Sequence, residues 1–245
     1  MGNLSRERRT AALIVRASAS ALFALALISG AAGAADVPVP GNYGESLDWY
    51  ERAADAGNPK AQYLLGVLIE SGQRGAVDPA DAAAWYAKAA AGGHAAAQLR
   101  LGQMFYAGRG VGRDLAQARR WYAAAAAQGL DAARYAHALM LERGQGGPRD
   151  ATAAARAYEV AATNSHLPSR VNLAMLIARG DGVVRDPVLA LAWLVAAERD
   201  GQQGLGPLRD ALAAELSAAQ RDTARDLAAQ VPKAVVKAPP AAPAQ

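Results

Sequence analysis

The chain has 245 residues, a formal net charge of +4 and no cysteine. Without cysteine, an exported product has no disulfide, no thiol nucleophile and no lipid attached through sulfur, so packing alone must hold the fold. Residues 1–34 contain four of the 26 basic side chains and one of the 22 acidic ones, which leaves a net charge of about +1 on the rest. This balance favours neither nucleic acid nor a membrane surface as a partner.

The first 34 residues have the pattern of a secretory signal peptide. A start with four arginines precedes the apolar run ASASALFALALI, which is too short to predict a membrane span. Ala32-Gly33-Ala34 has the small residues of a cleavage site. We therefore expect a periplasmic protein with no stable membrane span after cleavage. A secreted product, or an anchored one if the signal stays uncleaved, is the alternative. Residues 35–41 are expected to form an extended lead-in.

The next stretch is organised by a 36-residue period. Ala157 takes the one missing place in a column that holds all four tryptophans of the chain. Because such an alignment rarely arises by chance, it indicates an internal repeat. A tyrosine column, two glycine columns and an aspartate column keep the same period. The columns are Trp49, Trp85, Trp121 and Trp193; Tyr50, Tyr86, Tyr122 and Tyr158; Gly57, Gly93, Gly129 and Gly201; Gly72, Gly108, Gly144 and Gly180; and Asp78, Asp114, Asp150 and Asp186.

Each column has a physical role in a pair of helices. An aspartate before an apolar-periodic segment can accept the free amide hydrogens of a helix's first turn. The glycines fall where each helix must end, since glycine readily takes the left-handed conformation that closes a helix. Gly66 and Gly102 lie inside second helices, where glycine costs about 1 kcal/mol against alanine, so they predict a close approach of two helices. The regularly spaced tryptophans are predicted to lie in the core between helices.

In chain order, the sequence predicts four helix pairs. The fourth pair is the least regular, because Ala157 replaces tryptophan, Ser165 replaces glycine and Pro168 enters near the second helix. A packing defect or a surface hollow is expected there. The four pairs cover residues 43–70, 79–108, 115–144 and 151–180.

The C-terminal part departs from the regular unit. A fifth first helix over 188–200 restores Trp193 and is followed by a longer loop and a helix over 207–216. Ser217-x-x-Gln220 is a capping box that opens a last helix, which ends near residue 230. Polar residues on this last helix suit the end of an array. The Pro/Ala-rich residues 231–245 are predicted to be disordered.

These units resemble the Sel1-like repeat, a relative of the tetratricopeptide repeat, over residues 42–230. The resemblance implies an all-α fold, an α/α solenoid of antiparallel helix pairs with period 36 and C-terminal capping helices: four full helix pairs plus a fifth atypical unit and a capping helix. Family members are mostly adaptors, and exported bacterial members are linked to envelope assembly, exopolysaccharide control, sensor-kinase regulation and host contact. The best-matching unit contains Ala82, Trp85-Tyr86, Ala89-Ala90, Gly93, Ala97-Gln98, Leu101-Gly102, Tyr106, Gly108, Gly110-Val111 and Asp114.

The sequence offers little for catalysis. His94 and His166 share one repeat phase but lie two units apart, too far for one metal, and His137 is best explained as a core or edge side chain. No S-x-x-K acylation motif in the exported part, no H-E-x-x-H, no phosphate loop and no G-x-S-x-G occurs. We therefore predict a protein that is not an enzyme, with no catalytic residue, metal site or cofactor. The alternatives are a periplasmic cell-wall-active hydrolase or glycan-binding protein, and a purely structural envelope spacer.

One local charge bias suggests a binding surface. Five arginines fall within two units, with Asp114 the only acid among them. They could meet an acidic partner loop or an anionic polysaccharide, or they could simply be a solvated face whose stems cover alanine-rich helices. We expect a monomeric, non-catalytic adaptor or regulatory scaffold of the bacterial cell envelope, which binds a protein partner on a concave face lined mainly by first helices. The five arginines are Arg100, Arg109, Arg113, Arg119 and Arg120.

Overall fold

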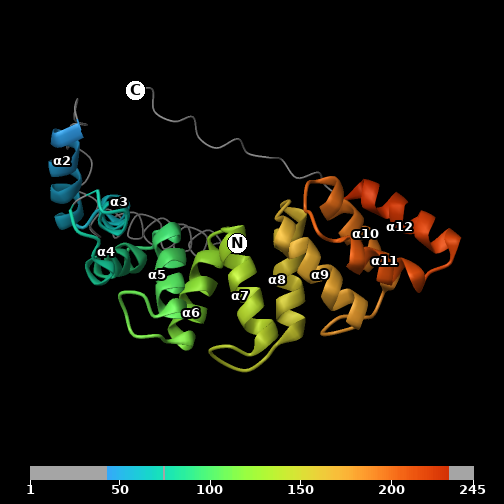
Figure 1. The fold of residues 1–245 in the computed structure, drawn as a ribbon. Coiled ribbons are helices and arrows are strands. Elements are labelled where there is room, and N and C mark those ends of the chain that lie inside the picture. The colour runs from blue at the N-terminus through green and yellow to red at the C-terminus, as the bar shows by residue number, and fades with distance from the viewer. Residues whose placement is uncertain (1–42, 74, 232–245) are drawn as a thin grey trace, which may run out of the picture.

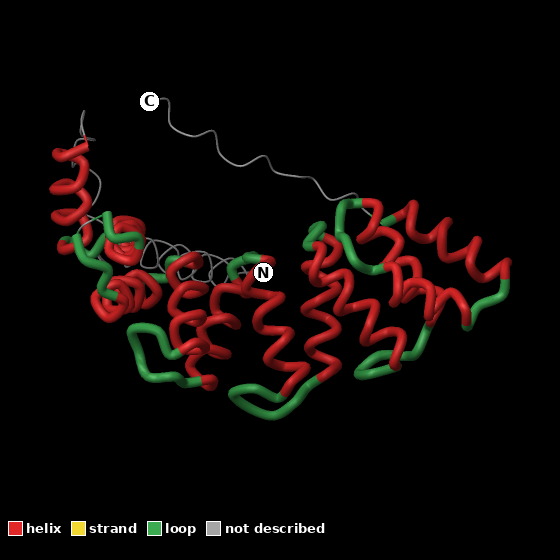
Figure 2. The backbone as a smooth tube through the Cα atoms, in the orientation of Figure 1, coloured by secondary structure: helices red, strands yellow, loops and turns green. Residues whose placement is uncertain are grey.

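The computed structural model describes residues 43–73 and 75–231, and this part of the chain is helical without any strand (Figure 1). The signal peptide, the lead-in and nearly all of the tail predicted above lie outside the described residues. The helices follow one another along an arc and are joined by short loops (Figure 2). None of the described helices is long and apolar enough to cross a membrane. The all-α solenoid of antiparallel pairs is confirmed.

The helices alternate between two sets. The first helices of the units are α2 (Tyr43–Asp55), α4 (Pro79–Ala91), α6 (Leu115–Ala127), α8 (Ala151–Thr163) and α10 (Pro187–Arg199). The second helices are α3 (Pro59–Glu70), α5 (Ala95–Ala107), α7 (Asp131–Arg143), α9 (Leu167–Arg179) and α11 (Gly206–Ala214). Helix α12 (Ala218–Gln230) follows as the last helix and packs on α10.

The predicted caps are present at the helix ends. The carboxylates of the aspartate column accept backbone N–H groups of the first turns of α4, α6, α8 and α10 at 2.8–3.1 Å. At α12, Ser217 Oγ accepts from the Gln220 backbone while Gln220 Oε1 accepts from the Ser217 backbone, which completes the capping box. These bonds satisfy amides that have no partner inside their own helix. The starts of α4, α6, α8, α10 and α12 are therefore fixed by local interactions that the sequence predicts.

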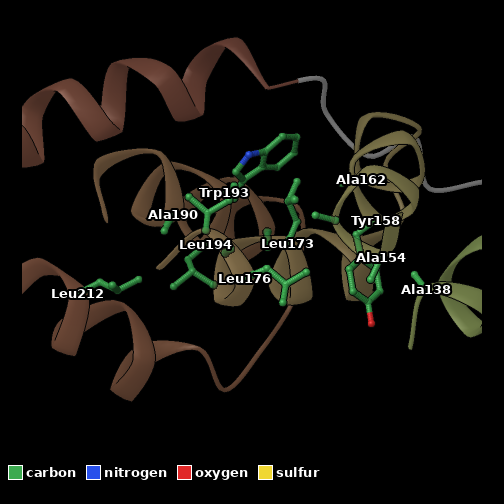
Figure 3. Packing of buried hydrophobic residues seen from close by; sticks show 14 of the residues in the cluster. Ala138, Ala154, Tyr158, Ala162, Leu173, Leu176, Ala190, Trp193, Leu194 and Leu212 are labelled. Atoms are coloured by element: carbon green, nitrogen blue, oxygen red, sulfur yellow. The ribbon is translucent and has the colours of Figure 1, made fainter. Parts of the chain in front are cut away.

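The tyrosine column forms the aromatic centre of each unit. A Cβ on Gly66 would lie 2.7 Å from the Tyr86 ring, and one on Gly102 would lie 2.8 Å from the Tyr122 ring. The mid-helix glycines thus admit the tyrosine of the next first helix, which confirms the predicted close approach. Tyr158 occupies the same place in the fourth unit, within a buried cluster of residues from α7 to α11 (Figure 3).

The tryptophan column is less central than the sequence predicts. Only Trp193 is buried, at 8% exposure, whereas Trp85 and Trp121 are half-buried at the border of a cluster built from α2 to α5. Lys88 Nζ lies 3.7 Å from the Trp85 ring centroid, on its open side. Successive side chains on a helix point about 100° apart. Because the tyrosine points into the interface between helices, the tryptophan before it points partly toward solvent. Trp49 is also half-buried against that cluster, so the core prediction holds fully for Trp193 alone among the four.

A polar column inside the array was not predicted. Gln98 Nε2 donates to the Ala90 carbonyl at 3.1 Å and its Oε1 accepts from Gln128 of the next unit at 2.7 Å. Two units later, the same places hold Arg170 and Asp200, which form a buried ion pair at 2.5 Å. Each pair satisfies the carbonyl end of a first helix and links two units. Within the described residues, no buried side-chain nitrogen or oxygen lacks a hydrogen-bond partner.

Candidate functional site

The five candidate arginines lie in three different environments. Arg100 and Arg109 border a small hollow of about 150 Å³ at the second unit, where Arg109 forms an ion pair with Glu70. Arg119 and Arg120 on α6 border a different hollow of about 320 Å³. The run of positive charge in the sequence is therefore divided among separate places on the surface.

The fifth arginine, Arg113, has a structural position. Its Nε donates to the Tyr106 carbonyl at 3.2 Å, which ties the loop to the end of α5. Arg149 and Arg185 occupy the same repeat phase and make the same bond to the carbonyl seven residues earlier, at 2.8 and 3.0 Å. A contact that recurs in three units serves the loop that joins them. Arg113 therefore has a role in the geometry of its unit that is independent of a partner.

A hollow of about 570 Å³ lies between α6 and α8, across α7. It contains Ala157, the residue that interrupts the tryptophan column, so the predicted hollow of the fourth unit is confirmed. Ala123 and His137 also border the 320 Å³ hollow, so the two hollows adjoin. We call them together the α6–α8 hollow. Its apolar lining includes Ala123, Ala126, Ala127, Leu141, Ala153, Ala157 and Val160.

The missing tryptophan explains why this space is open. Trp121 of α6 packs against a cluster of α2–α5 residues, and Trp193 of α10 lies in a cluster that contains α8 residues. The column tryptophan therefore reaches back toward the preceding unit. A tryptophan at position 157 would reach toward α6 and α7, where the hollow lies. Alanine removes most of that side chain, and the neighbouring alanines do not refill the space.

The rim of the α6–α8 hollow is basic. Arg119 Nη1 donates to the Pro148 carbonyl at 2.9 Å, which fixes the guanidinium without neutralising its charge. Arg120 and Arg156 are exposed and occupy the same repeat phase on α6 and α8. Among the described residues, neither has a hydrogen-bonding or ion-pair partner. Asp150 is the one acid in the lining, and its Oδ1 accepts the Ala153 N–H at 2.8 Å.

Arg156 is not among the arginines predicted from the sequence, because only arginines that lie close together along the chain were grouped. Arg156 is 36 residues after Arg120, and equivalent positions of neighbouring units lie side by side on the first helices. The repeat phase was therefore the signal that could have found it. Arg134 also lines the hollow, but it forms an ion pair with Asp131 at 2.5 Å.

The three histidines lie in three different units, at α5, α7 and α9. His94 Nδ1 accepts the Ala97 N–H at 3.3 Å as the cap of α5, and His166 Nδ1 lies 2.9 Å from Ser169 Oγ. His137 lies between the two parts of the α6–α8 hollow, where burial, and then the nearby charge of Arg119, lower its pKa. No group of three or more metal-ligating side chains is found in the described part of the chain.

Comparison with known proteins agrees with the architecture. A family model of the Sel1 repeat matches residues 19–58, 59–94, 95–130, 131–166 and 168–201. A protective antigen of uropathogenic Escherichia coli strains with an SLR fold is similar at 31% identity and a TM-score of 0.67, over 76% of this chain and 40% of the antigen. This chain thus spans two fifths of that protein's length.

A second solved structure supports the fold alone. The Sel1 repeat protein from Oxalobacter formigenes is 23% identical, with a TM-score of 0.66, over 78% of this chain and 81% of that one. No curated protein matches the sequence. Five matched repeats cover most of the chain, and the structure has the helix pairs and columns of that repeat, so the chain belongs to the Sel1 repeat family.

Proposed function

We propose that the protein is a non-catalytic scaffold of the bacterial cell envelope that holds a partner protein on the face formed by its first helices. Sel1 repeat proteins generally mediate protein–protein interaction. The observation that carries the proposal is the α6–α8 hollow, which spans two units and combines an apolar lining with a basic rim. A rigid array presents such a surface without an ordering cost for its own backbone, which favours binding.

The envelope location rests on the sequence of residues 1–34. Their basic start, short apolar run and small-residue site support export. The exported part has nearly balanced charge, which favours a specific contact over adsorption to membranes or nucleic acid. We place the protein in the periplasm as a monomer.

Photocrosslinking in living cells tests this function. A photoreactive residue at Val160 or Ala116, both in the lining of the α6–α8 hollow, should yield one reproducible envelope protein by mass spectrometry. The same residue at Ala132, which is exposed on α7 and is not in the lining, is the matched control and should yield none of it. Glycan adducts alone would replace the proposal with a wall-binding role, and absence of any protein adduct would overturn it.

Catalysis is tested separately. Purified protein incubated with peptidoglycan fragments should return them unchanged. Turnover that survives repurification, and that is abolished by His137→Ala, would assign the α6–α8 hollow to a hydrolase and contradict the scaffold function, because His137 is the one histidine in its lining.

A further inference from the structure

We propose that the α6–α8 hollow binds a short acidic segment of the partner protein and that an aromatic side chain of this segment fills the place left open at Ala157. This inference rests on the proposed function and names the kind of partner surface that the scaffold holds. It follows from three features of the hollow: its position in the repeat, its lining and its charge.

The position indicates an aromatic occupant. Trp121 and Trp193 lie at this phase in the third and fifth units, and each packs against a cluster that contains residues of the preceding unit, so this place in the repeat can hold an indole. At the fourth unit, Tyr158 remains buried at the phase of Tyr86 and Tyr122, although Ala157 replaces the tryptophan beside it. A volume of about 570 Å³ falls within the range of sites that bind small molecules and side chains. The unit therefore has an open space, with ample room for an aromatic ring, at the place where other units hold a tryptophan.

The lining suits a ring rather than a polar group. Ala153 and Ala157 of α8 face Ala123 and Ala127 of α6, and none of these side chains can donate or accept a hydrogen bond. Val160 adds an apolar side chain that is 46% exposed, unusual among the large hydrophobic residues of the described chain. Burying an aromatic side chain here would remove its own apolar area and that of Val160 from water.

The rim indicates that the residues flanking the ring are acidic. Arg120 and Arg156 stand at equivalent places on α6 and α8, and Arg119 is held beside them by the Pro148 carbonyl. Asp150 is the only acid of the lining, and it is engaged by the backbone of α8. Carboxylates on both sides of an inserted ring would meet these guanidinium groups, and arginine forms two-pronged bonds with carboxylates.

The chain's own C-terminal segment does not have this chemistry. Residues 232–245 contain two lysines and no aspartate, glutamate or aromatic side chain. A basic segment would be repelled by Arg120 and Arg156, and its small side chains would leave the vacancy unfilled. Charge complementarity therefore favours a segment from another protein over this tail.

Selection from a random dodecapeptide library on the full-length protein provides the test, because it works before the partner protein has been identified. Peptides that bind wild-type protein and fail to bind the Ala157→Trp variant should be enriched in one aromatic residue with aspartate or glutamate on both sides. Ala157→Trp restores the residue of the other units, so it should fill the hollow while the array stays folded, which circular dichroism checks. Enrichment of basic or non-aromatic peptides, or no enrichment at all, would overturn the inference.

The best selected peptide is then measured by fluorescence anisotropy. Affinity should fall by at least about tenfold for Ala157→Trp and for Arg156→Glu, and it should decrease with added salt. Ala132→Trp, which adds the same side chain outside the lining, should change affinity less than about twofold. Arg156 is exposed, so its variant reports on charge even if Ala157→Trp fails to fold.

Equal binding to wild type and to Arg156→Glu would remove the acidic segment from the proposal. The scaffold function is judged separately: a protein crosslinked at Val160, together with a failed peptide selection, would retain the proposed function and reject only this inference. Crosslinking and peptide binding that both fail would reject both.

Discussion

Replacing Asp200 by asparagine tests the polar column that links the units. The Arg170 side chain is fully buried and its Nη1 donates to Asp200 Oδ2 at 2.5 Å, with the Asp200 side chain only 5% exposed. Removing one member of a buried ion pair costs about 3–5 kcal/mol, because the other charge stays buried without its counter-ion. We expect about 3 kcal/mol, near the lower limit, because Arg170 keeps its bond to the Ala162 carbonyl at 3.1 Å.

The matched control is the double variant Arg170→Gln with Asp200→Gln. It copies the neutral Gln98–Gln128 pair that occupies the same places two units earlier, so it should recover most of the lost free energy of unfolding. Urea unfolding at pH 7, followed by circular dichroism, measures both variants, and two probes are needed because repeat arrays can unfold in segments. A cost below about 1 kcal/mol for Asp200→Asn, or a double variant less stable than the single one, would refute the reasoning.

Three further predictions concern the aromatic columns, the mid-helix glycine Gly102 and the histidines. Tyr86→Ala should lose about 3–5 kcal/mol, and Trp85→Ala clearly less, because the tyrosine is fully buried and the tryptophan half-buried; equal losses in urea unfolding would restore the tryptophan to the core. Gly102→Ala should lose about 1–3 kcal/mol despite alanine's better helix propensity, since its Cβ would lie 2.8 Å from a tyrosine ring; a gain in melting temperature would contradict this packing. Acidification should destabilise the fold, because burial lowers the pKa of all three described histidines in the folded protein. Their contribution to the free energy of unfolding is fully present above about pH 6.5, the pKa of an unfolded histidine, and is lost as the pH falls through the lower pKa values of the folded state. Urea unfolding at a series of pH values from 7.5 to 5 measures this loss. A stability unchanged over that range would remove this linkage for His94, His137 and His166.

The repeat could be predicted because its signals are local. Asp114 caps a helix within three residues of itself, and Gly102 indicates a close approach, because a Cβ there would lie 2.8 Å from the Tyr122 ring. The choice between adjacent columns was harder. Trp121 and Tyr122 share the period equally, and only the three-dimensional direction of each side chain decides that the tyrosine points into the interface. Residue size favours tryptophan for the core, so the sequence interpretation overstated its burial.

Charge along the chain was a poor guide to charge on the surface. Arg109 and Arg119 are ten residues apart in sequence but border different hollows, because Arg109 lies in the loop after α5 and Arg119 lies on α6. Arg113 is engaged by a backbone carbonyl, which sequence composition does not reveal. Repeat phase was the better guide, because Arg120 and Arg156 are distant in sequence and equivalent in the fold. The same phase relates Gln98 to the buried Arg170.

The irregular unit is where this array can be specific. A perfectly regular solenoid presents the same surface at every step and so cannot fix the register of a partner. Loss of tryptophan at Ala157 gives up the burial of a large aromatic side chain on one side of α8. The neighbouring Tyr158 still holds α8 in place, because its ring lies 5.9 Å from that of Tyr135 on α7 and belongs to a cluster that continues through Leu173 and Leu176 of α9 to Leu194 of α10 (Figure 3). Because these contacts hold the helix without a tryptophan, the space beside Ala157 can stay open for the proposed partner segment without unfolding the unit.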